Sequence, residues 1–170
     1  VIYLIAVTGM RFAECLGLTW DSVDYDNKVL SVDKTWNYKT NLDFSSTKTK
    51  SSIRKIPLDD STLELLKKYR QDHWLENKDN RIFSNISNNA VNKTLRYIVG
   101  RNVHAHSLRH TYASFLISKH VELLSISKIL GHENMNITIE VYAHQLKELE
   151  DESNSEVREI FGNLGANLGQ

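Results

Sequence analysis

The sequence has a single cysteine, Cys15, and a single proline, Pro57. One cysteine excludes an internal disulfide framework and a cysteine-rich zinc site, and it fits a reducing compartment. Apolar runs long enough to span a bilayer are absent, and no secretory signal opens the chain. These absences predict a cytoplasmic protein with no membrane partner.

A net charge is also lacking, because the 21 basic side chains balance the 21 acidic ones. This balance argues against a simple basic nucleic-acid binder. The charges are nevertheless unevenly placed: residues 34–119 carry sixteen basic and seven acidic side chains, and no acid lies between Arg81 and Lys119. Such a basic block is either a phosphate-binding surface or an ordinary solvated face, and charge alone does not decide between them.

Apolar periodicity predicts a mainly α fold with a small antiparallel β-sheet, in the α+β class. Residues 28–57 contain short alternating runs and indicate two or three strands, separated by polar stretches at 37–41 and 45–52. In the helix expected over 106–118, Leu108, Tyr112, Phe115 and Leu116 form the predicted core stripe. The other expected helices cover residues 1–17 (interrupted near Thr8 and Gly9), 59–76, 87–99, 122–130 and 137–146.

The composition divides the chain into one domain over residues 1–147 and an acidic, partly flexible C-terminal tail over residues 148–170. Residues 1–7 are already core-like, and no initiator methionine or helix cap precedes them. We therefore expect the chain to be a fragment whose upstream part is missing.

Four short segments carry residues suited to phosphate chemistry. In Thr8–Glu14 (TGMRFAE), Glu14 can orient Arg11 from the same helical face. In residues 45–50 (SSTKTK), Lys48 and Lys50 lie where a loop lysine could reach a phosphate or protonate a leaving oxygen. Taken alone, the first segment is more typical of an ion pair on a helix surface, and the second is a weak signal because lysines on turns are commonplace.

The other two segments add histidines, an arginine and a tyrosine. In His106–His110 (HSLRH), the three-residue spacing puts His106 and Arg109 on one helix face. In residues 130–144, Gly131 is expected to end a helix beside His132, and Tyr142 follows ten residues later. Singly, these are more typical of a buried histidine, a surface arginine and a core tyrosine.

Taken in order, the Arg, Lys, His-x-x-Arg, Gly-His and Tyr segments resemble the catalytic domain of the tyrosine recombinases, the phage integrase family. The resemblance covers roughly residues 8–145 and implies a site-specific recombinase that integrates or excises a phage or mobile element. It implies that Tyr142 cleaves DNA to give a 3′-phosphotyrosine and a free 5′-hydroxyl, so that religation needs no ATP.

The resemblance assigns a role to each remaining site residue. Arg11 and Arg109 would hold the non-bridging phosphate oxygens, which removes the need for a metal or other cofactor. Lys48 would protonate the 5′ leaving oxygen, with Lys50 as the competing candidate. His106 would help to move the tyrosine proton, His132 would hydrogen-bond the phosphate, and Glu14 would support Arg11. His104, His106 and His110 could suggest zinc, but no acidic or cysteine ligand set accompanies them in the sequence.

The expected partner is double-stranded DNA carrying attachment sites, bound by a homo-oligomer that forms a tetrameric synapse. Lys93, Arg96 and Arg101 are the main candidates for contacts to the DNA backbone. A bacterial or phage origin is implied. Two alternatives stay open: a type IB topoisomerase-like activity, and a DNA-binding relative that has lost catalysis.

Overall fold

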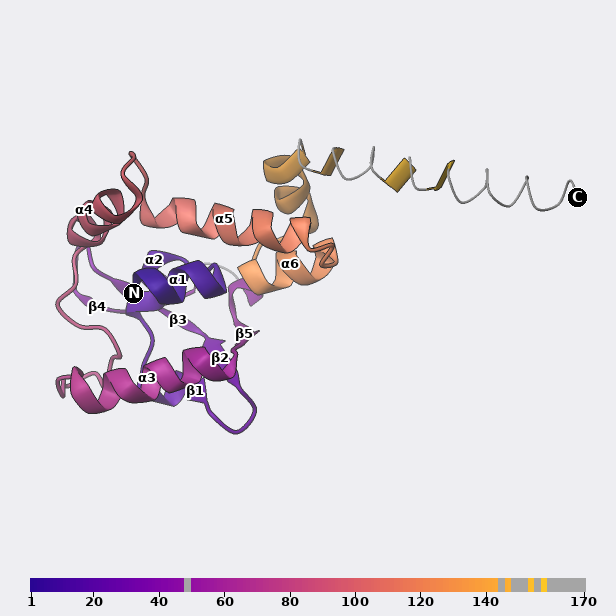
Figure 1. Ribbon diagram of the computed structural model, residues 1–170. Helices are drawn as coiled ribbons and strands as arrows, with labels where there is room; N and C mark the ends of the chain where they lie inside the picture. The colour runs from indigo at the N-terminus through magenta and orange to yellow at the C-terminus, as the bar shows by residue number, and fades with distance from the viewer. Residues whose placement is uncertain (48–49, 144–145, 148–152, 155–156, 159–170) are drawn as a thin grey trace, which may run out of the picture.

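The computed structural model describes residues 1–47, 50–143, 146–147, 153–154 and 157–158. It confirms a mainly helical fold with small antiparallel sheets (Figure 1). The helices are α1 (Ile2–Thr8), α2 (Phe12–Leu16), α3 (Asp60–Asp72), α4 (Asn88–Val99), α5 (Ala105–Ser118) and α6 (Leu123–Leu130), with short 3-10 turns η1 (Trp20–Ser22) and η2 (Lys50–Ser52). The strands are β1 (Val23–Asp24), β2 (Val29–Val32), β3 (Lys34–Asn37), β4 (Asp43–Ser46) and β5 (Arg54–Pro57), and residues 135–143 form a further helix.

The interruption expected near Gly9 separates two short helices. Gly9 caps α1 in the left-handed conformation (φ 64°), and its N–H donates to Ile5 O. A Cβ at this position would lie 2.5 Å from the ring of Tyr112 and 2.9 Å from the side chain of Leu130. The glycine therefore allows both the turn and the close approach of α5 and α6.

Two small sheets occupy the middle of the molecule. One has the strand order β1-β2-β5, and β2 pairs antiparallel with β5 so that Leu30 lies opposite Ile56. The other is the β3-β4 hairpin, in which Trp36 lies opposite Phe44 and packs edge-on against it. Three of its strand residues, Asn37, Ser45 and Ser46, fall in stretches that the sequence indicated as polar connections. Its only buried residue is Trp36, so the alternation that marks a strand is almost absent.

Phe115 of α5 was predicted to belong to the core stripe of that helix, but it is exposed. Its side chain is 57% exposed, and the face of α5 that is fully buried consists of Ala105, Arg109, Ala113 and Ile117. The prediction was wrong for Phe115 alone, since Leu108, Tyr112 and Leu116 are partly buried and pack against the core. Apolar periodicity also did not reveal that Arg109 lies in the middle of the fully buried face, because it assigns arginine to the solvent.

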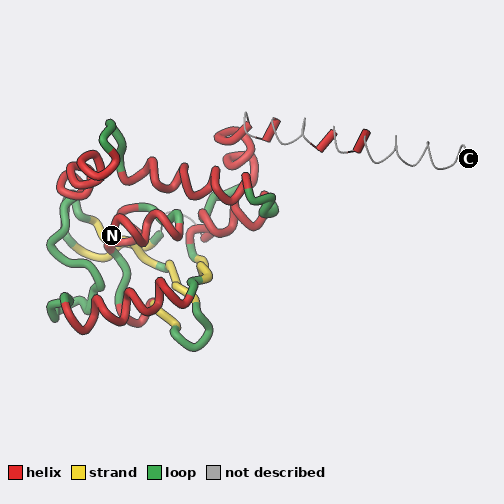
Figure 2. Tube along the Cα trace, in the orientation of Figure 1, coloured by secondary structure: helices red, strands yellow, loops and turns green. Residues whose placement is uncertain are grey.

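The helices enclose the sheets from two sides (Figures 1 and 2). Helix α3 contributes Leu63 and Leu66 to the same core as Leu30 and Ile56 of the β1-β2-β5 sheet, and α5 packs on the other side of the molecule against α1 and α6. Helix α2 packs against β3 and α6 packs against β5. These contacts place the N-terminus of α2, the start of α5 and the end of α6 next to one another. Within the described part of the chain, none of the helices has the length and apolar character needed to cross a bilayer.

Candidate active site

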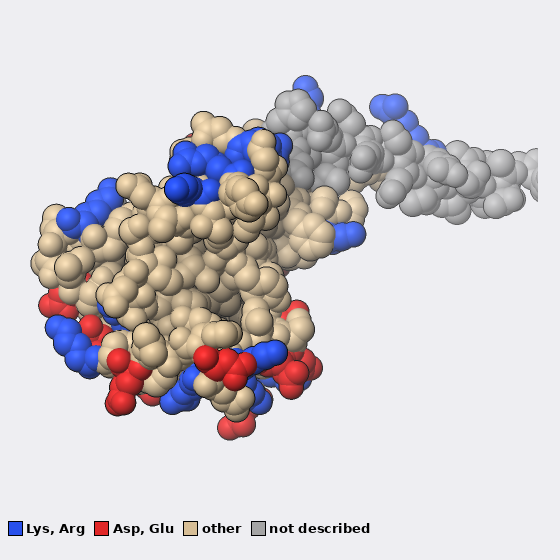
Figure 3. Space-filling view, turned by 60° about the vertical axis from the view of Figure 1, so that its left-hand side comes forward, with Lys and Arg blue, Asp and Glu red and all other residues tan. Residues whose placement is uncertain are grey.

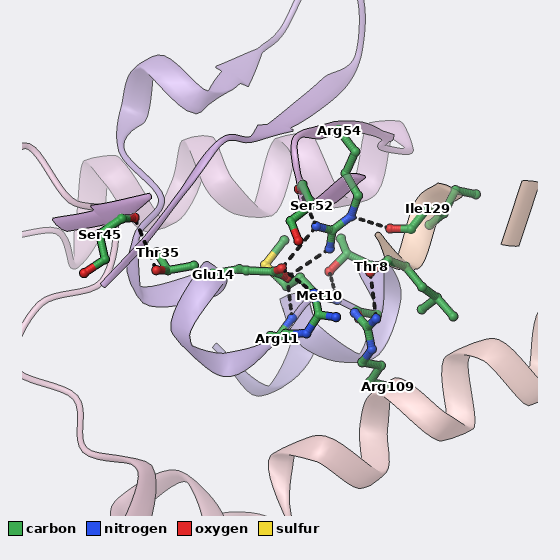
Figure 4. A network of polar contacts seen from close by, with 12 residues as sticks. Thr8, Met10, Arg11, Glu14, Thr35, Ser45, Ser52, Arg54, Arg109 and Ile129 are labelled. Carbon is green, nitrogen blue, oxygen red and sulfur yellow. Dashed lines mark hydrogen bonds and ion pairs between the residues drawn. The ribbon is translucent and has the colours of Figure 1, made fainter. Parts of the chain in front are cut away.

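The carboxylate of Glu14 is the centre of a buried polar network (Figure 4). It accepts hydrogen bonds from the backbone N–H of Arg11 (2.7 Å) and from Arg11 Nη1 (2.9 Å), and from both terminal nitrogens of Arg54 (3.2 and 2.9 Å). Burial alone would raise the pKa of Glu14, but the hydrogen bonds and charges of Arg54 and then Arg11 outweigh it, so the pKa is lowered. Glu14 is therefore an ionised carboxylate, and it holds the guanidinium of Arg11 in place. The sequence predicted that Glu14 would support Arg11 in this way.

Arg54 is a residue of this network that the sequence reasoning missed. Besides the two bonds to Glu14, its Nε donates to Ile129 O (2.5 Å) and its Nη1 donates to Ser52 O (3.0 Å). It therefore ties β5 to α2, to the η2 turn and to the end of α6. A usable signal was present, because period-two alternation in β5 places Arg54 on the same face as the buried Ile56.

The guanidinium of Arg109 is held by the backbone. Its Nη1 donates to Gly9 O (2.8 Å) and its Nη2 donates to Leu130 O (2.7 Å), and the residue is only 3% exposed. Burial, followed by the charge of Arg11, lowers the pKa of Arg109 to about 10. The group therefore stays protonated at neutral pH, and its further N–H donors remain for a ligand.

His132 follows the left-handed Gly131 that ends α6 (φ 67°). A Cβ on Gly131 would lie 2.9 Å from Arg54 Nη1, so this glycine also permits the Arg54 network. The Nδ1 of His132 is 2.7 Å from the hydroxyl of the buried Thr138, which fixes the ring. Burial and the positive charges of Arg109, Arg11 and Arg54 lower the pKa of His132 to about 4, so the ring is neutral at neutral pH.

Tyr142 lies in the helix of residues 135–143 and is 7% exposed. Its hydroxyl is 3.2 Å from Nδ1 of His110, a residue that the sequence reasoning did not assign to the site. Burial raises the pKa of Tyr142, with the charge of Arg109 acting in the opposite direction. The phenol is therefore protonated at neutral pH and needs a base before it can act as a nucleophile.

One pocket of about 490 Å³ brings most of the predicted residues together. Its walls include Arg11, Glu14, His106, Arg109, His132 and Tyr142, together with His110, Thr47 and Ser52. Lys48 lies outside the described residues, as does the side chain of Lys50, and of the described residues on either side Thr47 and Ser52 line the pocket. Lys93, Arg96 and Arg101 are exposed on and just after α4, outside the pocket. In the described ranges, no cluster of three or more His, Cys, Asp or Glu side chains is placed to hold a metal ion.

Charge is also distributed unevenly over the surface (Figure 3). Acidic side chains gather in the lower half of the view, at the level of α3 and the β1-β2 hairpin of Figure 1. Lys and Arg side chains predominate in the upper half, at the level of α4 and α5, which agrees with the lack of acids between Arg81 and Lys119.

A family model described as "Phage integrase family" matches residues 1–148 of this chain. The chain belongs to the phage integrase family. Among the curated phage integrase relatives is the tyrosine recombinase XerC-like protein of Caldanaerobacter subterraneus subsp. tengcongensis, which is 28% identical over 94% of this chain and 49% of the relative. The integrase of Staphylococcus phage L54a is 30% identical over 91% of this chain and 50% of the relative.

Solved structures of tyrosine recombinases share the fold of this phage integrase domain. The Tn1549 transposon integrase in complex with circular intermediate DNA gives a TM-score of 0.70 at 21% identity, covering 88% of this chain and 58% of that one. XerA recombinase gives a TM-score of 0.67 at 21% identity, covering 88% of this chain and 54% of that one. The chain spans about half the length of the curated relatives that it matches. The resemblance inferred from the four segments is thus confirmed at the level of family and fold.

Proposed function

We propose that this chain is the catalytic domain of a site-specific DNA recombinase that cleaves and rejoins strands through a 3′-phosphotyrosine. The observation that carries the proposal is the convergence of Arg11, Arg109, His132 and Tyr142, from four separate segments, on one pocket. Two cations beside a phenol suit a phosphodiester whose negative charge grows in the transition state. Membership of the phage integrase family supports the same chemistry.

In the proposed reaction, Tyr142 Oη forms a bond to phosphorus and the bond from phosphorus to the 5′ oxygen breaks. Arg11, held by Glu14, and Arg109, held by two carbonyls, donate to the non-bridging oxygens. The neutral His132 donates a further hydrogen bond from its Nε2 to the phosphate. The 5′ oxygen leaves as a hydroxyl after taking a proton from Lys48, or from Lys50 if Lys48 does not reach.

The proposed substrate is duplex DNA carrying attachment sites of a phage or other mobile element, exchanged within a tetramer of the protein. Solved relatives of the same fold include recombinases in complex with DNA, such as the Tn1549 integrase with transposon right end DNA. Exchange between duplexes is proposed over topoisomerase-like relaxation, because integrases and Xer-type recombinases recur among the relatives. The described site residues likewise favour an active enzyme over a binder that has lost catalysis.

The proposal predicts a covalent protein–DNA adduct. The full-length protein would be incubated with a nicked duplex bearing the sequence that it selects from a random library, so that the cleaved end diffuses away and the adduct accumulates. We expect a band on a denaturing gel that forms in the presence of EDTA, and peptide mass mapping that places the nucleotide on Tyr142. Binding without any adduct would contradict the proposed cleavage and indicate a non-catalytic binder.

Phosphate contacts from the surface around α4 predict a steep salt dependence of DNA binding. Replacing both Lys93 and Arg96 with alanine should weaken binding at low salt and reduce the slope of log K against log salt by about 1 for each phosphate interaction removed. Fluorescence anisotropy with a labelled duplex measures this slope. The matched control replaces Lys67 and Lys68, which are exposed on α3 beside the acidic side of the molecule, and should leave the slope unchanged. A slope that the α4 substitutions do not alter would exclude this surface from DNA contact.

A further inference from the structure

The contact between His110 and Tyr142 joins two helices that are distant in the sequence. Nδ1 of His110 lies 3.2 Å from Tyr142 Oη, and the two ring centroids are 6.1 Å apart. The body of Tyr142 packs in the apolar cluster that includes Ala113, Ile117 and Leu130, so its hydroxyl is held in a fixed place. His110 is therefore the imidazole that meets the atom on which the proposed chemistry begins.

His106 is placed differently, although it lines the same pocket. It lies one helical turn before His110 on α5, and the two rings meet edge to face with centroids 4.8 Å apart. This contact limits the rotation of the His110 ring. Burial, followed by the nearby His110, Arg109 and Arg11, lowers the pKa of His106. His106 thus contacts the ring of His110, whereas His110 contacts the tyrosine hydroxyl.

We propose that His110 is the general base for Tyr142, and this inference rests on the recombinase function proposed above. As the bond from Oη to phosphorus forms and the bond from phosphorus to the 5′ oxygen breaks, the phenolic proton passes to Nδ1 of His110. A neutral His110 with its proton on Nε2 becomes an imidazolium, while the 5′ oxygen takes its proton from the loop lysine. In religation the imidazolium returns the proton to Tyr142.

The surroundings of His110 are consistent with this role. Because burial raises the pKa of Tyr142, a phenolate is not available beforehand and a base in contact with Oη is required. His110 itself is solvent-exposed, so its ring can exchange protons with water between turnovers. Among the described residues, the titratable and charged groups that line this pocket with it are Arg11 and Glu14 of α2 and its cap, His106 and Arg109 of α5, His132 and Glu133 after α6, and Tyr142.

The contact can be tested without DNA. Nitrogen-15 NMR of histidine-labelled protein should show a hydrogen-bonded Nδ1 for His110, assigned by its loss in His110→Gln. In Tyr142→Phe this signal should shift toward that of a solvated imidazole, whereas the signals of His73, on the far side of the molecule, should stay in place. An Nδ1 signal that Tyr142→Phe does not move would overturn the proposal.

The base role is tested by the rate of adduct formation on the nicked duplex as a function of pH. Glutamine keeps the polarity of His110 but cannot take up a proton, so His110→Gln should slow cleavage by about 10²- to 10⁴-fold and change the pH dependence of the cleavage rate. His73→Gln serves as the matched control and should keep the wild-type profile. Circular dichroism melts of His73→Gln should match the wild type, and those of His110→Gln should show no more than the loss of the one hydrogen bond to Tyr142.

A duplex with sulfur in place of the 5′ bridging oxygen distinguishes proton transfer from Tyr142 from proton transfer to the leaving group. A thiolate leaves without a proton, so this substrate should rescue a variant that lacks the leaving-group lysine, but His110→Gln should remain slow. Rescue of His110→Gln by sulfur would place the histidine at the leaving group and overturn the proposal.

Wild-type rates in His110→Gln together with a loss in His106→Gln would assign the base to His106 instead. A wild-type protein that forms no adduct would contradict the proposed recombinase function, whereas an active wild type with an unimpaired His110→Gln would contradict this inference alone.

Discussion

Replacement of Tyr142 with phenylalanine is expected to abolish the covalent adduct on nicked DNA while leaving the protein folded. Phenylalanine keeps the ring that packs among Ala113, Ile117 and Leu130, and it removes only the hydroxyl. Removal of the hydrogen bond to His110 should lower the free energy of unfolding by about 0.5–1.5 kcal/mol. Adduct formation is measured on a denaturing gel and DNA binding by anisotropy, and binding should be nearly unchanged.

The matched control for this substitution is Tyr69→Phe. Tyr69 is half-buried and contacts Phe83 on the far side of the molecule, outside the pocket of Tyr142. It should form the adduct at the wild-type rate. An adduct that persists in Tyr142→Phe would show that another side chain is the nucleophile.

Replacement of Arg54 with methionine is expected to destabilise the fold by about 3–5 kcal/mol, the range for breaking a buried ion pair. Methionine fills part of the space of the arginine stem, but it leaves Glu14 buried with Arg11 as its remaining ion-pair partner and frees the carbonyl of Ile129. Because the Arg54 side chain is only 6% exposed, solvent does not screen the loss. Urea unfolding at pH 7 followed by circular dichroism measures the change.

Two further variants isolate the cause of this destabilisation. Lys55→Met alters the neighbouring, exposed position of β5 and should change the free energy of unfolding by less than about 0.5 kcal/mol. The double variant Glu14→Leu with Arg54→Met removes both buried charges and should recover part of the stability that Arg54→Met alone removes. A stability of Arg54→Met within about 1 kcal/mol of the wild type would contradict the structural importance of the pair.

The helices and the sheet formed by β2 and β5 were predictable because their local signals agree with their burial. Asp59 and Ser87 accept the capping hydrogen bonds of α3 and α4, and Gly9 and Gly131 end helices in the left-handed conformation, as their residue types favour. The β3-β4 hairpin was not predictable from alternation, because Trp36 is the only buried side chain of its two strands and its neighbours are polar or half-buried. Hydrophobic alternation detects strands that line a core, and this one barely does.

The candidate site shows a similar division between what the sequence reveals and what the fold adds. The ordered motifs identified Arg11, His106, Arg109, His132 and Tyr142, all of which line one pocket. Arg54 and His110 were missed because their partners, Glu14 and Tyr142, are 40 and 32 residues away. Only the folded chain shows which of two histidines on one helix meets the tyrosine hydroxyl.

The anchoring of Arg109 to the carbonyls of Gly9 and Leu130 has an evolutionary consequence. The side chain proposed to bind phosphate also closes the packing of α1, α5 and α6, so natural selection for a stable protein protects it even when recombination no longer matters. A descendant that decays into a DNA-binding protein without recombinase activity should therefore lose Tyr142 or the loop lysine before Arg109. In such lineages a retained Arg109 indicates only descent from a recombinase, whereas a retained Tyr142 indicates that the protein can still cleave DNA.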